Sequence, residues 1–234
     1  MKHKYQIVWE SIEEKIQSGV YQEKLPTEDS LIQEYDVSRN TIRKALEVLI
    51  QKGYIIPIQG SGFFIRRVPI DGAINLETFR GLSRDFKNSN IETHIIELEE
   101  RTADEEIARG LKCEVGTPIY YICRLRIVDG MKWVIEYSYY NRKHVPYLNL
   151  EIIKNSIYNY IREGLNKQIG YVDRILETRL LTQEEADILD LTPAEPALLS
   201  VNRSMFKTGE IFDYSIDVHH YKHARFLKLS NISE

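Results

Sequence analysis

Hydrophobic side chains recur at helical spacing over the first fifty residues of the chain and predict three short amphipathic helices. The first spans residues 5–17 and ends before Gly19. The second follows Thr27 and the third follows Ser38, both good N-caps, and Gly53 lies just beyond the third. The inward stripes are Tyr5, Val8, Trp9, Ile12 and Ile16, then Leu31, Ile32 and Tyr35, then Ile42, Ala45, Leu46 and Leu49.

After residue 53 the pattern changes from helix to strand. The stretch YIIPIQGSGFFIRR holds two β-rich runs joined by Gln59-Gly60-Ser61-Gly62, which predicts a hairpin. Residues 68–75, VPIDGAIN, show no periodicity, so we expect a linker there. A first domain is therefore expected at residues 1–67 and a second at residues 76–234.

The second domain repeats its own order of signals in residues 102–138 and 182–215. Each copy opens with a capping box, Thr102 to Glu105 and Thr182 to Glu185, which predicts a short helix. An X-Pro step, a β-rich strand, a glycine turn and a return strand follow, and the return strands carry Glu136-Tyr137-Ser138 and Asp213-Tyr214-Ser215. This repeat predicts an α+β fold: an antiparallel sheet with helices packed against it and an internal pseudo-two-fold axis.

Composition adds that the chain is of ordinary globular character, with 234 residues, 43% of them hydrophobic. Its apolar runs are far too short to span a membrane, and its first residues lack a signal-peptide core, so we expect a cytoplasmic protein with no membrane partner. Cys113 and Cys123 are expected to be free buried thiols, because their spacing fits neither a zinc site nor a disulfide framework.

Positive charge is local in this acidic chain, whose formal net charge is −4. Residues 39–67 hold six Lys or Arg against one acid, Glu47. One interpretation is a solvated charged face. The other is a DNA-reading helix, since a tight turn before Ser38 and an apolar stripe facing inward would put cations and amides at the exposed N-terminal end of the third helix. Those side chains are Arg39, Asn40, Arg43 and Lys44, with Thr41 suited to a phosphate or a thymine methyl.

The stretch LPTEDSLIQEYDVSRNTIRKALEVLIQKGYIIPIQGSGFFI resembles the winged helix-turn-helix of GntR-type transcription regulators. The resemblance implies double-stranded operator DNA as a partner. It also implies DNA contacts at Arg39, Thr41, Arg43 and the wing glycine Gly60, and phosphate contacts at Ser38 and Lys44. Two positions depart from the family pattern: Asp29 stands where many relatives carry Arg, and Phe63 stands where Thr is common.

In the second domain, strand alternation puts Arg124 and Arg126 on one face of their strand. Glu136 and Asp213 hold matching places in the two return strands. Two guanidiniums and a carboxylate on each side suit a ligand with an anionic end and a hydroxyl-rich end. The alternative is that these residues are surface ion pairs on a solvent-facing strand.

Residues 74–230 resemble the effector-binding (UTRA) domain of the HutC branch of GntR regulators, whose fold is similar to that of a small lyase, chorismate lyase. The motifs NRKHVPYL and NSIYNYI are most similar to the trehalose-operon repressors of Gram-positive bacteria, which implies trehalose 6-phosphate as the effector. The resemblance implies a phosphate held by Arg124, Arg126, Ser156 and Ser83. It implies a sugar held by Glu136 and Asp213, with Tyr158 nearby.

Other functions remain as alternatives. Asp217, His219, His220 and His223 lie close in sequence, but neighbouring strand residues face opposite ways, so we expect no metal and no cofactor. No nucleophile and base stand at a catalytic spacing, so we expect no enzyme, although the lyase-like fold keeps that reading open. The effector could be a different sugar phosphate or an amine or histidine-pathway metabolite. We expect a homodimer on a palindrome, associating through the second domain.

Overall fold

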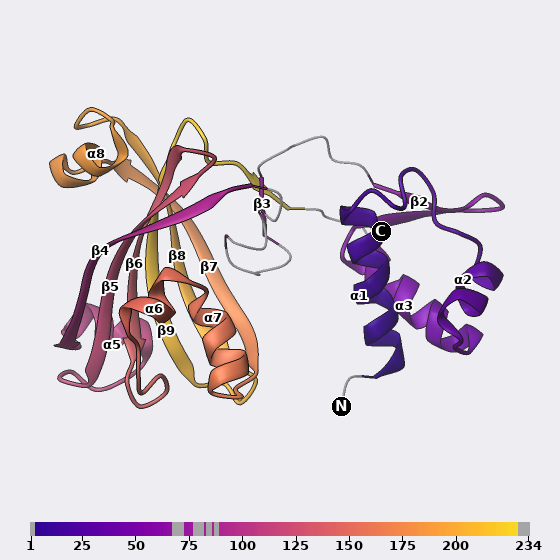
Figure 1. Cartoon of the computed structure of the whole chain (residues 1–234), viewed down its shortest axis with the longest axis horizontal. Helices are drawn as coiled ribbons and strands as arrows, with labels where there is room; N and C mark the ends of the chain where they lie inside the picture. The colour runs from indigo at the N-terminus through magenta and orange to yellow at the C-terminus, as the bar shows by residue number, and fades with distance from the viewer. Residues whose placement is uncertain (1–2, 67–72, 77–81, 83–85, 87–88, 229–234) are drawn as a thin grey trace. The chain divides into compact units, whose positions relative to one another are not determined.

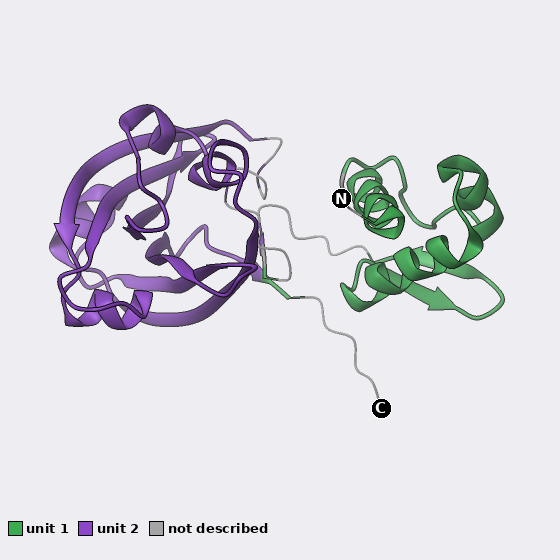
Figure 2. Cartoon of the chain, turned by 90° about the horizontal axis from the view of Figure 1, so that it is seen from below, with its two compact units in different colours: residues 1–71, 75–77, 227–234 green, residues 72–74, 78–226 purple. Residues whose placement is uncertain are grey.

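The computed structural model describes residues 3–66, 73–76, 82, 86 and 89–228. The chain divides into two compact units (Figure 2): unit 1 comprises residues 1–71, 75–77 and 227–234, and unit 2 comprises residues 72–74 and 78–226. The division falls within the segment expected as a linker. That segment ends differently from the expectation, because Ile74 and Asn75 form a short strand, β3, that pairs with β10 (Phe226–Leu227).

Unit 1 is a three-helix bundle with a two-stranded wing, as the sequence predicts (Figure 1). Its apolar stripes meet in one core, in which Ile12, Leu31, Ile42, Ala45 and Leu49 are fully buried. The elements are α1 (Lys4–Gln17), α2 (Glu28–Tyr35), α3 (Arg39–Gln51), β1 (Ile55–Ile58) and β2 (Gly62–Ile65).

The helix boundaries follow the predicted caps. The Thr27 hydroxyl accepts a hydrogen bond from the Ser30 amide, and the Ser38 hydroxyl accepts one from the Thr41 amide. Between them Asp36 adopts a left-handed conformation, φ 46°, which a short polar side chain tolerates better than a branched one does. The chain therefore turns sharply enough for α2 and α3 to pack as a helix-turn-helix.

Unit 2 is built on one antiparallel sheet of six strands in the order β4-β5-β6-β9-β8-β7. In Figure 2 the strands of this unit curve strongly, so the sheet has an inner and an outer face. The elements are β4 (Ile91–Thr102), α5 (Glu105–Leu111), β5 (Pro118–Val128), β6 (Met131–Asn141), α6 (Leu150–Lys154), α7 (Ile157–Asn159), the π-helical turn η1 (Tyr160–Gly164), β7 (Ile169–Leu180), α8 (Gln183–Leu189), β8 (Pro196–Phe206) and β9 (Ile211–His220).

The predicted repeat is confirmed, and each copy is longer than expected. A long strand, β4 or β7, precedes the helix of each copy, so the repeating unit is strand-helix-strand-strand. The two copies meet where β6 pairs with β9, and Ser138 lies opposite Ser215 at that seam. The pseudo-two-fold axis therefore passes through the centre of the sheet.

One predicted cap is wrong. The N-cap of α5 is Asp104, whose carboxylate accepts from the Ile107 amide at 2.9 Å, and not Thr102. Thr102 is the last residue of β4 and pairs with Pro118, so the strand holds it in an extended position. The capping box at Thr182 and Glu185 is present as predicted.

The two faces of the sheet are covered by different helices. On the outer face α8 packs on apolar strand residues such as Leu125, Ile135 and Val218. On the same face α5 packs on Ile119, Ile211 and Tyr214. On the inner face α6, α7 and η1 cover one end of the sheet through Ile153, Ile157 and other apolar residues. Every helix in the described residues is too short or too polar to cross a membrane.

Candidate functional site

The exposed face of α3 carries the side chains that sequence analysis proposed as DNA contacts. Ile42 and its three stripe partners point into the core of unit 1, which leaves Arg39, Asn40, Arg43 and Lys44 exposed. Thr41 is half-buried, and its hydroxyl is hydrogen bonded to that of Ser38 at 2.9 Å. The helix thus presents two guanidiniums, an amide and an ammonium from its first two turns.

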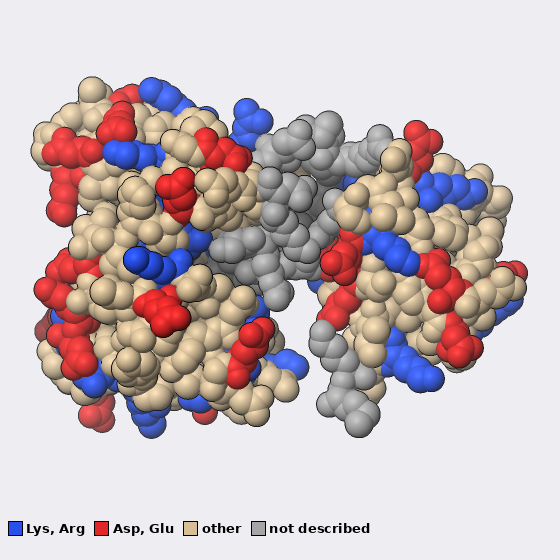
Figure 3. All heavy atoms as spheres, in the orientation of Figure 1, with Lys and Arg blue, Asp and Glu red and all other residues tan. Residues whose placement is uncertain are grey.

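The cations on this face already have partners within unit 1. Arg39 Nη2 lies 2.5 Å from Asp29 Oδ1, and Arg43 Nε lies 3.1 Å from Glu28 Oε2. Lys44 instead places its Nζ 4.4 Å from the centroid of the Tyr5 ring. Basic and acidic residues are accordingly interspersed over the view of unit 1 in Figure 3.

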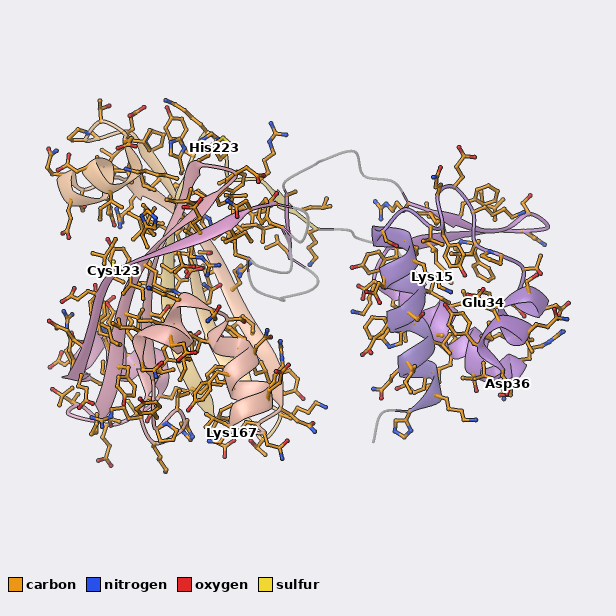
Figure 4. The ribbon with its side chains drawn as sticks, in the orientation of Figure 1. Lys15, Glu34, Asp36, Cys123, Lys167 and His223 are labelled. Atoms are coloured by element: carbon orange, nitrogen blue, oxygen red, sulfur yellow. The ribbon has the colours of Figure 1, made fainter. Side chains whose placement is uncertain are left out.

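A third ion pair, between Lys15 of α1 and Glu34 of α2, joins the first two helices (Figure 4). The Tyr21 hydroxyl also donates to Glu34, at 2.9 Å. Burial and this carboxylate together raise the pKa of Tyr21. The platform behind α3 is therefore held by polar contacts as well as by its core.

The wing has an open tip and a packed base. Gly60 has φ 75°, and no atom would lie within 4 Å of a Cβ placed there, so a DNA backbone could approach it closely. At the base, the Leu25 amide donates to the Phe63 carbonyl and the Ile65 amide to the Glu23 carbonyl. Phe63 packs on the core of unit 1, which explains an aromatic residue at that position. Ser61 is exposed at the tip.

Unit 2 carries a set of buried and half-buried polar side chains on the inner face of its sheet, which we call the polar array. The strand register aligns them in rows across β5, β6, β9 and β8. Strand alternation turns all of them to the same face. The array consists of Arg124, Arg126, Glu136, Ser138, Ser200, Asn202, Ser204, Asp213, Ser215, Asp217 and His219.

At one end of the polar array a single carboxylate joins two guanidiniums. Glu136 Oε2 lies 2.5 Å from Arg124 Nη2 and 3.6 Å from Arg126 Nη1. Arg124 Nη1 also donates to the Ile153 carbonyl of α6 at 2.8 Å. Burial alone would raise the pKa of Glu136, but the two arginines outweigh it and lower that pKa below its usual value. The carboxylate is therefore ionised and occupies the guanidiniums in this state.

At the other end the acids are held by neutral donors. The Ser204 hydroxyl donates to Asp213 Oδ2 at 3.0 Å and the Tyr158 hydroxyl donates to it at 3.2 Å. Asp217 Oδ2 accepts from Ser200 at 3.1 Å and from Asn202 at 2.9 Å. Burial raises the pKa of Asp213 to about 7; burial and then Glu136 raise that of Asp217 to about 6.

Some buried polar atoms of the array lack a hydrogen-bond partner among the described residues. Arg124 Nε, Asp213 Oδ1 and His219 Nδ1 are buried without a hydrogen-bond partner in the part of the chain that the structure describes. Unsatisfied buried polar atoms are costly, so a cluster of them indicates a site that a ligand completes. The polar array therefore has the chemistry of a binding site.

The structure brings together four of the predicted effector residues, Arg124, Arg126, Glu136 and Asp213, and Tyr158 reaches the array through Asp213. No hydrogen bond joins Ser156 to the array within the described residues; its hydroxyl caps α7 by accepting from the Asn159 amide. Ser83 lies outside the described residues. The pairing also differs from the expectation, because Glu136 binds the guanidiniums that we assigned to a phosphate.

Sequence analysis missed the serines, Asn202 and Asp217 as members of the site. Strand alternation could have found part of the set, since residues 213, 215, 217 and 219 share a face. The metal hypothesis groups Asp217 and His219 with His220 and His223. The structure separates them: His219 bonds Ser200 in the array, whereas His220 stacks on His223. No group of three potential metal ligands comes together in the described residues.

Comparison with protein families matches both units. A family model described as bacterial regulatory proteins of the gntR family matches residues 4–65, and one described as the UTRA domain matches residues 87–225. Among curated proteins of Bacillus subtilis, the uncharacterized regulator YydK is 37% identical over 97% of this chain and 98% of its own length. TreR is 30% identical over 96% of this chain and 96% of its own length. GmuR is 30% identical over 97% of this chain and 98% of its own length.

Solved structures give the same picture. The crystal structure of YydK superposes with a TM-score of 0.83 at 36% identity and covers 98% of this chain and all of that one. The effector-binding domain of the B. subtilis trehalose repressor TreR superposes with a TM-score of 0.55 at 26% identity, over 61% of this chain and 99% of that domain.

Proposed function

This chain belongs to the gntR family of bacterial regulatory proteins and carries a UTRA domain, and on that premise we propose that a sugar phosphate, trehalose 6-phosphate first among them, controls its binding to operator DNA. The family makes it a HutC-type transcriptional repressor with a DNA-binding domain and a ligand-binding effector domain, and not an enzyme. The finer points, namely the effector, the contacts and the dimer, are proposals.

The observation that carries the effector proposal is the asymmetry of the polar array. Arg124 and Arg126 stand six and eight residues after Pro118, and Asn202 and Ser204 stand six and eight residues after Pro196. At these matched positions the repeat thus supplies guanidiniums in one copy and neutral hydrogen-bonding groups in the other, where Arg174 of β7 donates to Asn202 Oδ1 at 2.7 Å. A ligand with a phosphate at one end and sugar hydroxyls at the other matches this distribution of charge.

An arriving phosphate would compete with Glu136 for Arg124 and Arg126. A phosphate offers more acceptor oxygens than a carboxylate and a second negative charge, so the exchange favours it. The released Glu136 carboxylate would then be available to sugar hydroxyls, as would Asp213. The two roles assigned to Glu136, partner of the arginines and acceptor for the sugar, thus belong to two states of one site.

The name of TreR and the motifs NRKHVPYL and NSIYNYI support trehalose 6-phosphate within the class of sugar phosphates. The equal identity of GmuR means that overall similarity does not single out this sugar. The test is therefore chemical. Operator binding would be followed by fluorescence anisotropy while trehalose 6-phosphate, free trehalose, glucose 6-phosphate and histidine-pathway compounds are added in turn.

Trehalose 6-phosphate is expected to release the operator, and free trehalose should be much weaker because it leaves the guanidiniums to Glu136. Arg124→Ala should bind the operator normally and respond about a hundredfold more weakly, since a lost bidentate charge-assisted contact is worth about 3 kcal/mol. A thermal melt confirms that the variant is folded. Equal potency of free trehalose, or a normal response of Arg124→Ala, would overturn the proposal that the two arginines bind a phosphate. Release of the operator by a histidine-pathway compound alone would show that the effector is not a sugar phosphate.

A further inference from the structure

The two guanidiniums of α3 are both held by the first turn of α2. Glu28 and Asp29 are the first two residues of α2, and Arg39 and Arg43 lie one turn apart at the start of α3. The pairs are Asp29 with Arg39 at 2.5 Å and Glu28 with Arg43 at 3.1 Å. Carboxylates are favoured at a helix N-terminus by the helix dipole, so the first turn of α2 is a suitable position for both acids.

These pairs contribute little to the stability of the fold. The side chains of Arg39 and Asp29 are 58% and 73% exposed, and that of Arg43 is 57% exposed. Ion pairs with such exposure are screened by water and salt. We expect these ion pairs to affect the binding of DNA to this surface instead.

A DNA phosphate and a carboxylate compete for the same guanidinium. Non-specific DNA binding depends on phosphate contacts that release counterions, and an arginine neutralised by an internal carboxylate has fewer counterions to release. A guanine edge is a neutral acceptor that does not repel the carboxylate in the same way. Arg43 is held through Nε, a geometry compatible with presenting its two terminal nitrogens to guanine O6 and N7.

The ammonium groups of the same surface are treated differently. Lys44 lies over the Tyr5 ring at 4.4 Å and Lys52 over the Trp9 ring at 4.2 Å. An aromatic ring orients a cation without neutralising its charge. The structure thus compensates the charge of the two guanidiniums, whereas the ring beside Lys44 leaves that ammonium its attraction for phosphate.

We propose that Glu28 and Asp29 are specificity-determining residues that act through Arg43 and Arg39, holding the guanidiniums for base edges and withholding them from backbone phosphates. The proposal rests on the proposed DNA-reading role of α3. Asp29 is also a position at which the chain departs from its family pattern, so the pair of Asp29 with Arg39 is not expected in the relatives that carry Arg there.

The experiment first selects a preferred duplex from a random DNA library with the native full-length protein. Dissociation constants for that duplex and for a scrambled duplex are then measured by anisotropy over a range of KCl concentrations for native protein, Asp29→Asn and Glu28→Gln. Asp36→Asn is the matched control: it makes the same charge change in the turn before α3, is exposed, and keeps a residue that tolerates the left-handed conformation.

We expect each test variant to bind the scrambled duplex more tightly, with a steeper salt dependence, while the selected duplex gains less. The ratio of the two affinities should fall roughly two- to fivefold per pair, the range of one exposed ion pair. Asp36→Asn should leave the ratio unchanged. An equal gain on both duplexes, or the same effect from Asp36→Asn, would show that the change in net charge alone causes the tighter binding, and would overturn the proposal.

A double-mutant cycle tests whether Asp29 acts through Arg39. If it does, Asp29→Asn should change the affinity ratio in the native background and leave it unchanged in Arg39→Ala. Persistence of the effect without Arg39 would refute the assignment. The proposed role of α3 in reading DNA bases is tested separately. It would be wrong if Arg39→Ala and Arg43→Ala both keep the native base preference on the selected duplex.

Discussion

Asp213 is a carboxyl group in a place where water cannot solvate its charge. It is 1% exposed, its two donors are hydroxyls, and the charged groups that act most on its pKa are Asp217 and Arg124. Burial dominates and raises its pKa to about 7, against 3.8 for a free Asp. The folded protein therefore binds a proton here in a pH range in which the unfolded chain does not.

That proton predicts a stability that depends on pH near neutrality. Because the pKa of Asp213 is raised on folding, unit 2 should become more stable as pH falls from 8 through 7. Below about pH 6.5 His219 has the opposite effect on stability, because burial lowers its pKa to about 3. Below about pH 6 the raised pKa of Asp217 adds to the stabilisation. Differential scanning calorimetry at pH 8 and pH 6.5 should show a larger rise in Tm for native protein than for Asp213→Asn. Identical rises in both proteins would contradict the assignment.

Arg43 and Lys44 are adjacent cations for which we predict different roles. Arg43→Ala should weaken binding to the selected duplex by about 1 to 3 kcal/mol and relax base preference, because a guanidinium reads guanine bidentately. Lys44→Ala should weaken selected and scrambled duplexes evenly and lower the salt slope by about one, because an ammonium contacts phosphate. Anisotropy on both duplexes separates the two. Equal losses on both duplexes for Arg43→Ala would argue against its role as a reader.

At the scale of elements, the two repeat helices differ in how they begin. Thr182→Ala removes the hydroxyl that accepts from the Glu185 amide at 3.3 Å, so it should destabilise unit 2 by about 1 kcal/mol. Thr102→Ala, at the matching place, should change stability by less than about 0.5 kcal/mol because Asp104 caps α5. Urea unfolding followed by circular dichroism gives both values. A cost for Thr102→Ala as large as that for Thr182→Ala would contradict the cap seen at Asp104.

The same contrast shows why some elements could be predicted from the sequence and others not. Helices α1 to α3 combine caps, a 3.6-residue period and glycine stops, so local signals agree with the fold. The strands β4 and β7 lie at the sheet edges and carry many charged, exposed residues, so their apolar pattern is weak. At Thr102 the capping-box pattern was satisfied, but pairing in the sheet decided the position of the cap.

For the site, alternation along β5 and the repeated acid-Tyr-Ser triplet located Arg124, Arg126, Glu136 and Asp213. The pairing of Glu136 with the arginines could not be predicted, because it depends on which neighbouring strand brings its residues opposite. Asn202 and Ser204 carry no charge and look like any strand residues in sequence. Only the register that aligns them with Ser215 and Asp213 makes them part of the array.

At the scale of the molecule, the outer edge of β7 is the surface on which we place the proposed homodimer. β7 is the last strand of the sheet order, and Tyr171, Ile175 and Leu180 on it are 61%, 55% and 60% exposed. A long edge strand with exposed apolar side chains is a template for pairing with another chain. A palindromic operator requires two copies of α3, which a second copy paired along this edge would supply.

We therefore predict that Ile175→Lys weakens the dimer by placing charge on this edge. Ile96→Lys is the control, because Ile96 lies on β4 at the opposite edge and is 45% exposed. Sedimentation velocity should give a dimer for native protein and for Ile96→Lys, and more monomer for Ile175→Lys. Removal of residues 1–70 should leave a dimer. A monomeric remainder, or equal effects of the two lysines, would move the interface elsewhere.

The seam between β6 and β9, where Ser138 faces Ser215, also bears on the history of the chain. Two separate half-length chains, each a strand-helix-strand-strand unit, would join along the same seam as a symmetric pair with identical binding groups on both sides. Gene duplication and fusion of such an ancestor would free each half to change alone. Arginines could then persist at two positions of one half while neutral residues took the matching positions of the other. A sensor for a ligand with two chemically different ends could therefore arise only after the two halves shared one gene.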